Sequence, residues 1–225
     1  MTQEEAIRKV VEEFVTELLA ILQPLVKEKA EPERAGLNLK PFFDHIRKPL
    51  FGRLSASQVS GHEDIIRELK EQDVPLAQAA YVLATAYHET AKKMQPVREG
   101  LNASDSWRKK NLRYYPWYGR GHVQLTWEEN YRKADQKLGL GGALVATPDL
   151  ALDPKVSAEV LVTGSVEGWF SADKQGKRHT LARHIKTGTL AEYKQARRII
   201  NLMDKADLIA GYAVIYKEAL EKAGY

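Results

Sequence analysis

A chain of 225 residues, of which 44% are hydrophobic, can bury a substantial core without help from a metal or a disulfide. Cysteine is absent, which excludes a disulfide framework and a thiolate zinc site and leaves the redox compartment open. Lysine and arginine outnumber the acidic residues by 34 to 30, and this net charge of +4 mildly favours anionic partners. Because the chain has no dense basic block, we expect no nucleic-acid partner.

The first residues, Met1-Thr2-Gln3-Glu4-Glu5, are acidic where a secretory signal would be basic. No uninterrupted apolar run approaches the length of a membrane span. We therefore expect a protein made in the cytoplasm without a signal peptide and without an integral membrane segment. We also expect it to be a monomer.

Residues 2–23 are predicted to form an amphipathic helix, since apolar side chains recur there at three- and four-residue steps. Pro24 and a polar run over residues 27–34 then interrupt the pattern. We expect residues 1–36 to be an N-terminal helical extension whose apolar stripe packs on the domain, with docking or membrane-surface binding as the alternative.

Three helices are predicted next. The first is a short aromatic-rich helix over residues 39–54, and the second opens at Ser55 or Ser57. The third has Pro75 at its first position and an apolar face, and it carries Glu89 in its last two turns.

Between Pro96 and Trp127 the periodicity disappears and glycine, asparagine, aromatic residues and arginine dominate. We expect this segment to be a functional loop with a small hairpin around Val123–Leu125. Trp117 and Tyr118, which lie in this loop, are expected to stack on a ligand, whereas Trp127 is expected in the core.

Four further helices are predicted from capping residues and periodicity. They run from Thr126, with Glu129 in a capping box, to Gly139; from Asp153 to Phe170; from Thr189, with Glu192, to Ile200; and from Asp204, with Asp207, to Ala223. Nearly every ordered element is thus helical. The sequence predicts a mainly α fold with at most a small β-hairpin, in one domain over residues 37–225.

Glu89 and Glu99 are the candidate catalytic pair. The C-terminal end of an apolar helix disfavours an anion at Glu89, whereas Glu99 lies among polar loop residues. Hydrolysis of a glycosidic bond needs one carboxyl group that delivers a proton and another that stays ionised. We therefore expect Glu89 to be the general acid and Glu99 the base.

His88 and Glu89 also invite comparison with the zinc-protease pattern His-Glu-x-x-His. The fifth position is Lys92, so the second zinc ligand is missing and no metal site is expected. Patterns of serine hydrolases and of phosphate-binding loops are absent from the sequence as well.

Four blocks of sequence together resemble the family nineteen glycoside hydrolases, which include plant-type chitinases and phage endolysins. The blocks are His88-Glu89-Thr90, Arg98-Glu99-Gly100-Leu101-Asn102, residues 119–131, and Ala196-Arg197-Arg198-Ile199-Ile200-Asn201. The resemblance implies a lysozyme-like helical fold with two lobes around a saccharide cleft. It also implies an inverting mechanism without a metal or another cofactor.

The resemblance implies that Thr126 positions the attacking water together with Glu99. Thr126 and Asn130 also have structural explanations, as a helix cap and a residue of the next turn, and Asn201 could merely end its helix. The residues expected to bind substrate are His88, Trp117, Tyr118, Gln124, Asn130 and Asn201.

The sequence departs from the family pattern in two places. Ala91-Lys92-Lys93 replace a usual glycine pair, and His122 stands where chitinases commonly carry proline. These departures, with the absence of cysteine, favour an endolysin that cleaves the β-1,4 bonds of bacterial peptidoglycan and acts on the cell wall after release. The alternatives are a chitinase acting on chitin oligomers, a non-catalytic saccharide-binding module, and membrane disruption by the last helix.

Overall fold

The computed structural model describes residues 37–225, and residues 38–225 form one compact unit. Helices dominate this unit, and its described residues contain only one sheet, in which β1 (Val97–Arg98) pairs antiparallel with β2 (Arg120–Gly121). The predicted mainly α class is therefore confirmed. The predicted helix over residues 2–23 and the extension over residues 1–36 lie outside the described residues.

The first three helices follow the sequence prediction. Helix α2 (Leu39–Ile46) continues into a π-helical turn, η1 (Arg47–Phe51). Helix α3 (Ala56–Glu71) begins after Ser55, whose side chain forms a capping box with Gln58. Helix α4 (Leu76–Glu89) follows Pro75 directly and ends at the predicted acid.

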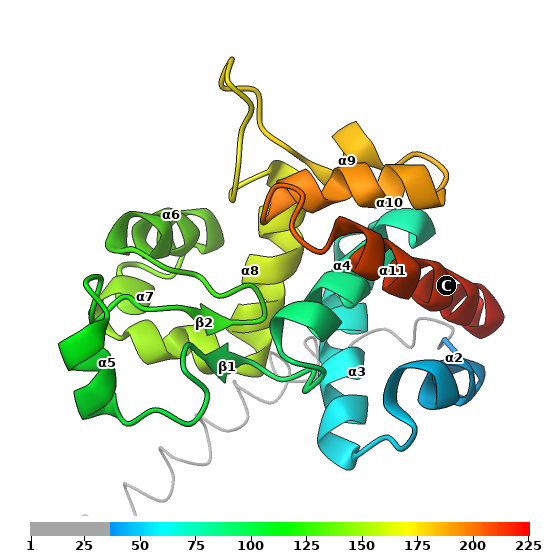
Figure 1. The fold of residues 1–225 in the computed structure, drawn as a ribbon, viewed down its shortest axis with the longest axis horizontal. Helices are drawn as coiled ribbons and strands as arrows, with labels where there is room; N and C mark the ends of the chain where they lie inside the picture. Colours follow the sequence, from blue (N-terminus) through cyan, green and yellow to red (C-terminus); the bar gives the residue numbers. More distant parts are fainter. Residues whose placement is uncertain (1–36) are drawn as a thin grey trace, which may run out of the picture. The chain divides into compact units, whose positions relative to one another are not determined.

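One lobe is built around α4, which packs chiefly against the last helix, α11 (Ala206–Ala223), and α2 also packs against α11 (Figure 1). The face of α11 considered for membrane disruption is fully buried in this contact, at Ile209, Ala213, Tyr216 and Leu220. That alternative therefore loses its structural basis. Among residues 37–225, no helix is long and apolar enough to cross a membrane.

The second lobe contains shorter elements, with α8 (Pro154–Glu167) running between the lobes (Figure 1). Its helices are α5 (Asp105–Asn111), α6 (Glu128–Leu138), α7 (Ala143–Ala146) and η2 (Pro148–Leu152). Three further elements precede α11, namely α9 (Leu181–His184), α10 (Leu190–Ala196) and η3 (Arg197–Ile199).

The functional loop is more ordered than predicted. Helix α5 interrupts it, and the side chain of Ser104 accepts a hydrogen bond from the backbone N–H of Trp107 at the start of this helix. The hairpin predicted around Val123–Leu125 is reduced to one isolated bridge between Arg120 and Leu125, and the real strand partner of β2 is β1.

Two predicted helix starts are wrong. Helix α6 begins after Trp127, which has φ +74°, and the Thr126 hydroxyl donates to the carbonyl of Gln124 instead of capping the helix. Helix α11 begins after Lys205, which has φ +55°, and no side chain caps it. In both places the residue directly before the helix has a positive φ. The residue predicted to cap the helix therefore lies one position before the actual N-cap.

Two predicted helices are also shorter than expected. Helix α8 stops at Glu167, and Gly168 follows in the left-handed conformation with φ +70°, a common way for a helix to end. Helix α10 stops at Ala196, and the chain continues as the 3₁₀ turn η3 rather than as an α-helix to Ile200.

Two fully buried histidines should make stability depend on pH. Burial lowers the pKa of both His62 and His122 to about 4, although hydrogen bonds to Gln58 and to Ser157 partly oppose it. The unfolded chain therefore binds more protons between pH 6.5 and 4, so stability is complete above that range and falls as pH drops through it. We expect a loss of about 3 kcal/mol for each histidine at full protonation.

Urea unfolding at pH 7.5, 6 and 5 would check this expectation. The variant His122→Asn should show a shallower decline in the free energy of unfolding over this range than the unaltered protein. A free energy of unfolding that does not change between pH 7.5 and 5 would contradict it.

Candidate active site

Glu89 is the last residue of α4, at the end of the helix that is most completely surrounded by the core. The helix end is secured by the buried Thr90, whose hydroxyl donates to the carbonyl of Ala86 and accepts a hydrogen bond from the N–H of Met94. The carboxyl group of Glu89 is therefore carried by a rigid element, with 17% of its side chain exposed.

The chain turns sharply after Glu89. Ala91, Lys92 and Met94 all have positive φ, at +50°, +67° and +54°. Glycine adopts this conformation without the steric cost that a Cβ atom brings. The glycine pair usual in the resembled family thus corresponds here to non-glycine residues held in a left-handed turn.

Arg197 is the direct partner of Glu89. Its Nη1 atom donates to Oε1 of Glu89 at 2.7 Å, and its Nε atom donates to the carbonyl of Asp204 at 2.7 Å. The arginine side chain is only 1% exposed, so the ion pair is shielded from solvent on the arginine side. Oε1 is thus occupied by Arg197, whereas Oε2 accepts no hydrogen bond from a described residue.

Glu99 follows β1 and is held by two neutral donors. The hydroxyl of Tyr114 donates to Oε1 at 2.6 Å, and the backbone N–H of Gly119 donates to Oε2 at 3.0 Å. The backbone carbonyl of Glu99 accepts a hydrogen bond from Nε of Arg108. Both the carboxylate and the main chain of Glu99 are therefore fixed in position.

Thr126 and Gln124 converge on the same place as Glu99. A Cβ atom built on Gly119 would lie 3.2 Å from Oε2 of Glu99, 3.3 Å from Oγ1 of Thr126 and 2.8 Å from Oε1 of Gln124. Three side-chain oxygen atoms thus lie close together beside Gly119. An oxygen cluster of this kind can hold a water molecule by hydrogen bonds.

The short distances around Gly119 predict the effect of the substitution Gly119→Ala. Gly119 does not have a positive φ, so Gly119→Ala should leave the fold intact while its methyl group crowds Oε2 of Glu99 and Oγ1 of Thr126. We expect kcat/KM on an amino-sugar polymer to fall about 10- to 100-fold. A displacement of the reacting groups by about 1 Å can lower the rate of reaction by as much as about 100-fold.

A matched control is Gly211→Ala on α11, where a Cβ atom meets nothing within 4 Å. This control should keep full activity and gain about 0.5–1 kcal/mol of stability from the better helix propensity of alanine. Full activity in Gly119→Ala would show that the oxygen cluster beside Gly119 is not used.

The remaining predicted polar residues lie either beside this cluster or beside the Glu89–Arg197 pair. Nδ2 of Asn130 donates to the carbonyl of Thr126, which fixes the turn that carries the threonine. Asn201 is exposed just after η3, in the same segment as the Asp204 carbonyl that Arg197 contacts. His88 is half-buried beside Glu89, and burial lowers its pKa against the opposing charge of Glu89. Their roles toward substrate stay predictions.

The aromatic expectations need correction. Tyr118 is 2% exposed, with the guanidinium carbon of Arg120 only 3.6 Å from its ring centroid, so it has no free face for a sugar. Trp127, expected in the core, is 40% exposed beside Tyr114, with ring centroids 4.9 Å apart. Trp117 is partly buried, and its Nε1 atom donates to the carbonyl of Val145.

The sequence reasoning missed Arg197, Tyr114 and Trp127 as site residues. Arg197 belongs to the late block that was used to select Asn201, so the block pointed to the right place but to a different residue. Tyr114 lies 15 residues after Glu99 in a segment without periodicity, and no local pattern links the two. Trp127 is exposed and has φ +74°, a conformation that its sequence neighbourhood does not predict.

Comparison with known proteins is consistent with this geometry. Residues 76–215 match the family model described as chitinase class I. The chain is 42% identical over 60 residues to the acidic 26 kDa endochitinase of Solanum lycopersicum, which is 26% of this chain and 21% of the relative. It is 52% identical over 55 residues to the acidic endochitinase pcht28 of Solanum chilense, or 24% and 19% of the two chains. The chain therefore spans about a fifth of the length of these curated relatives.

Solved structures resemble the fold over a longer stretch. Chitinase C from Streptomyces griseus HUT6037 matches 84% of this chain and 76% of its own, with a TM-score of 0.54 and 19% identity. A chitinase C mutant matches 86% of this chain and 96% of its own, with a TM-score of 0.53 and 17% identity. At this level of identity the likeness extends to the arrangement of the helices.

Proposed function

Since the chain belongs to the chitinase class I family, we propose that it is a glycosidase that hydrolyses the β-1,4 bonds of an amino-sugar polymer, and that this polymer is bacterial peptidoglycan. The observation that carries the proposal is the pair of oriented carboxyl groups, one held by Arg197 and the other by Tyr114 and Gly119. A two-carboxylate site is what glycosidic hydrolysis requires.

Glu89 acts as the general acid in this mechanism. Its Oε2 atom delivers the proton to the departing glycosidic oxygen, while Arg197 holds Oε1 and fixes the orientation of the carboxyl group. As the proton leaves, the carboxyl group becomes an anion beside the guanidinium. An ion pair with Arg197 therefore forms as the proton leaves, and it stabilises the carboxylate that the transfer produces.

Glu99 acts as the base. A water molecule bound between Oε2 of Glu99 and Oγ1 of Thr126 would contact both oxygen atoms, which lie close together beside Gly119. Because the Thr126 hydroxyl donates to the carbonyl of Gln124, its oxygen is free to accept a hydrogen bond from that water. Attack by this water on the face opposite the departing oxygen inverts the configuration of the sugar.

Peptidoglycan is favoured over chitin by the basic balance of the chain and by its departures from the family pattern at Ala91-Lys92-Lys93 and at His122. Peptidoglycan carries carboxylates, whereas chitin is neutral, so a net charge of +4 favours the former. The role that follows is that of an endolysin. A chitinase is the second candidate, because the family description and the names of the curated relatives are those of chitinases.

Digestion of two substrates in parallel tests the proposal. Purified sacculi and soluble chitin oligomers are incubated with the protein, and the products are analysed by mass and by reducing ends, with the double variant Glu89→Gln/Glu99→Gln as the blank. We expect hydrated, reducing disaccharide products from sacculi at a higher rate than products from chitin. Release from chitin alone would support the chitinase, and release from neither would support a non-catalytic saccharide-binding module.

A further inference from the structure

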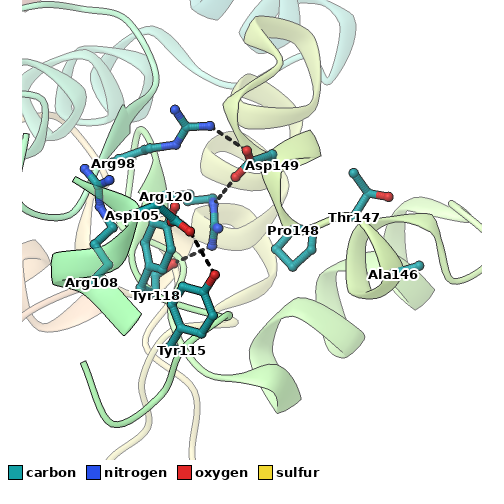
Figure 2. Close-up of a pocket in the computed structure, with 10 residues that line it drawn as sticks. All are labelled: Arg98, Asp105, Arg108, Tyr115, Tyr118, Arg120, Ala146, Thr147, Pro148 and Asp149. Carbon is teal, nitrogen blue, oxygen red and sulfur yellow. Dashed lines mark hydrogen bonds and ion pairs between the residues drawn. The ribbon is translucent and has the colours of Figure 1, made fainter. Parts of the chain in front are cut away.

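A cavity of about 450 Å³ lies beside the strand that leads to Glu99 (Figure 2). Its wall combines charged groups from four segments that are distant in sequence. They are Arg98 on β1, Asp105 and Arg108 on α5, Arg120 on β2, and Asp149 on η2. Three guanidinium groups and two carboxylates face one opening, an excess of one positive charge.

Asp149 is already neutralised within this cavity. Its Oδ2 atom accepts a hydrogen bond from Arg98 at 2.5 Å, and its Oδ1 atom accepts one from Nε of Arg120 at 2.7 Å (Figure 2). Two guanidinium groups therefore share one carboxylate. Arg98 and Arg120 together carry one positive charge more than Asp149 can neutralise. This excess charge is available to a ligand.

Arg108 and Arg120 are buried but keep unused donors. Arg108 is 5% exposed, and its Nε and Nη2 atoms donate to the carbonyls of Glu99 and Gly100, while no described residue accepts from Nη1. Arg120 is 4% exposed and likewise has no described acceptor for Nη2. Neither atom is fully buried, so both are accessible to solvent.

Asp105 provides a negative charge on the wall of the cavity. It is exposed in the first turn of α5 and accepts a hydrogen bond from the hydroxyl of Tyr115 at 2.9 Å, and no ion pair to a described residue neutralises it (Figure 2). The aromatic ring of Tyr115 and the ring of Pro148 provide apolar walls. Cationic donors and an unpaired carboxylate thus face the same cavity.

We propose that this cavity binds a free amino-acid end, in which an ammonium group and a carboxylate are attached to one carbon, on the peptide of the cell-wall substrate. The carboxylate binds Arg98, which donates to Asp149 through Nη2 alone, and Nη1 of Arg108. Guanidinium groups recognise carboxylates by such charge-assisted hydrogen bonds. The ammonium group binds Asp105. The inference rests on the proposed function, because chitin carries no peptide.

The position of the cavity fits a substituent of the polymer that is being cut. Gly119 contacts the carboxylate of Glu99, and its neighbours in the chain, Tyr118 and Arg120, both line the cavity. A wall peptide of four residues spans up to about 13 Å when extended. The peptide can therefore leave the glycan at the catalytic carboxylates and end in the cavity, which selects peptide-bearing strands over bare ones.

Titration calorimetry with two peptides tests this inference directly. Both are the tripeptide L-alanyl-γ-D-glutamyl-X with an amidated C-terminus, where X is meso-diaminopimelate or lysine. The first has a free amino-acid end on its side chain, and the second has only the ammonium group. We expect the diaminopimelate peptide to bind at least about tenfold more tightly, as one charge-assisted contact is added.

Two variants locate the binding. Arg98→Gln should remove the preference for the diaminopimelate peptide, and Asp105→Asn should weaken both peptides about equally. The control is Arg47→Gln, whose arginine is similarly exposed, at 50% against 42% for Arg98, and is also paired with an aspartate, but does not line the cavity. It should change neither affinity.

Equal binding of the two peptides, or a preference that survives Arg98→Gln, would overturn the inference. So would inorganic phosphate that displaces the diaminopimelate peptide at equal concentration, because the cavity would then be a general anion site. Hydrolysis of sacculi is measured separately. Preferred binding without hydrolysis would refute the proposed function alone, and hydrolysis without preferred binding would refute the cavity alone.

Discussion

Replacement of Glu89 by glutamine should lower kcat on the natural polymer by about 10²- to 10⁴-fold, because an amide cannot deliver a proton to the departing oxygen. The fold should persist, since glutamine offers an oxygen where Oε1 now accepts the 2.7 Å hydrogen bond from Arg197. Initial rates of reducing-end release, with circular dichroism of the variant, would measure both effects.

A substrate with a good leaving group separates the acid from the base. An aryl glycoside whose phenolate departs without protonation should restore much of the rate of Glu89→Gln and none of the rate of Glu99→Gln. Both variants should fall equally on the natural polymer. If the aryl glycoside restored Glu99→Gln instead, the roles of the two glutamates would be reversed.

Replacement of Arg197 by methionine should cost about 3 kcal/mol of stability, the range found when one partner of a buried ion pair is removed. The arginine is 1% exposed and Glu89 only 17%, so the carboxylate would be left largely buried without its counter-charge. The anchor from Nε of Arg197 to the carbonyl of Asp204 would be lost as well. Urea unfolding at pH 7 would give the free energy change.

Two further variants test whether the unpaired buried carboxylate causes the loss of stability in Arg197→Met. Arg197→Met/Glu89→Gln should be more stable than Arg197→Met alone, because the neutral amide needs no counter-charge. Arg198→Met is the matched control, since this neighbouring arginine donates to Gln195 at the surface and should cost less than about 0.5 kcal/mol. A double variant no more stable than Arg197→Met would contradict the explanation.

Elements defined by local chemistry could be predicted from the sequence. Ser55, Asp153 and Thr189 each cap a helix with a side chain that reaches two or three residues along, so the signal lies within one turn. Thr126 and Asp204 carry the same type of signal and fail. At those places the chain enters the helix through a left-handed residue, and tertiary packing sets that conformation.

Helix α5 was within reach of sequence analysis. Ser104 caps it, Asp105 lies in its first turn, and lysines lie in its last turn, which is the arrangement that the helix dipole favours. Its polar composition hid it, because only one residue of this helix, Arg108, is buried and no apolar period exists. The cap and the order of charges predict this helix without any contribution from hydrophobic periodicity.

The candidate site was predicted in its residues but not in their partners. Glu89, Glu99, Thr126 and Gln124 were all selected from motifs, and the structure brings the last three to one point. The partner of Glu89 lies 108 residues away in the chain. A contact between residues so far apart in the chain produces no local pattern in the sequence. Arg197 could therefore be identified as the partner of Glu89 only from the structure.

Helix α5 has one more consequence, for how this protein could diversify. Its side chains are exposed except for Arg108, and that residue reaches the main chain of Glu99 and Gly100. Helix α5 is thus connected to the main chain of Glu99 by the hydrogen bonds of one guanidinium group. Changes of sequence between residues 101 and 113 that keep Arg108 should therefore leave the main chain of Glu99 and the buried helix that carries Glu89 in place.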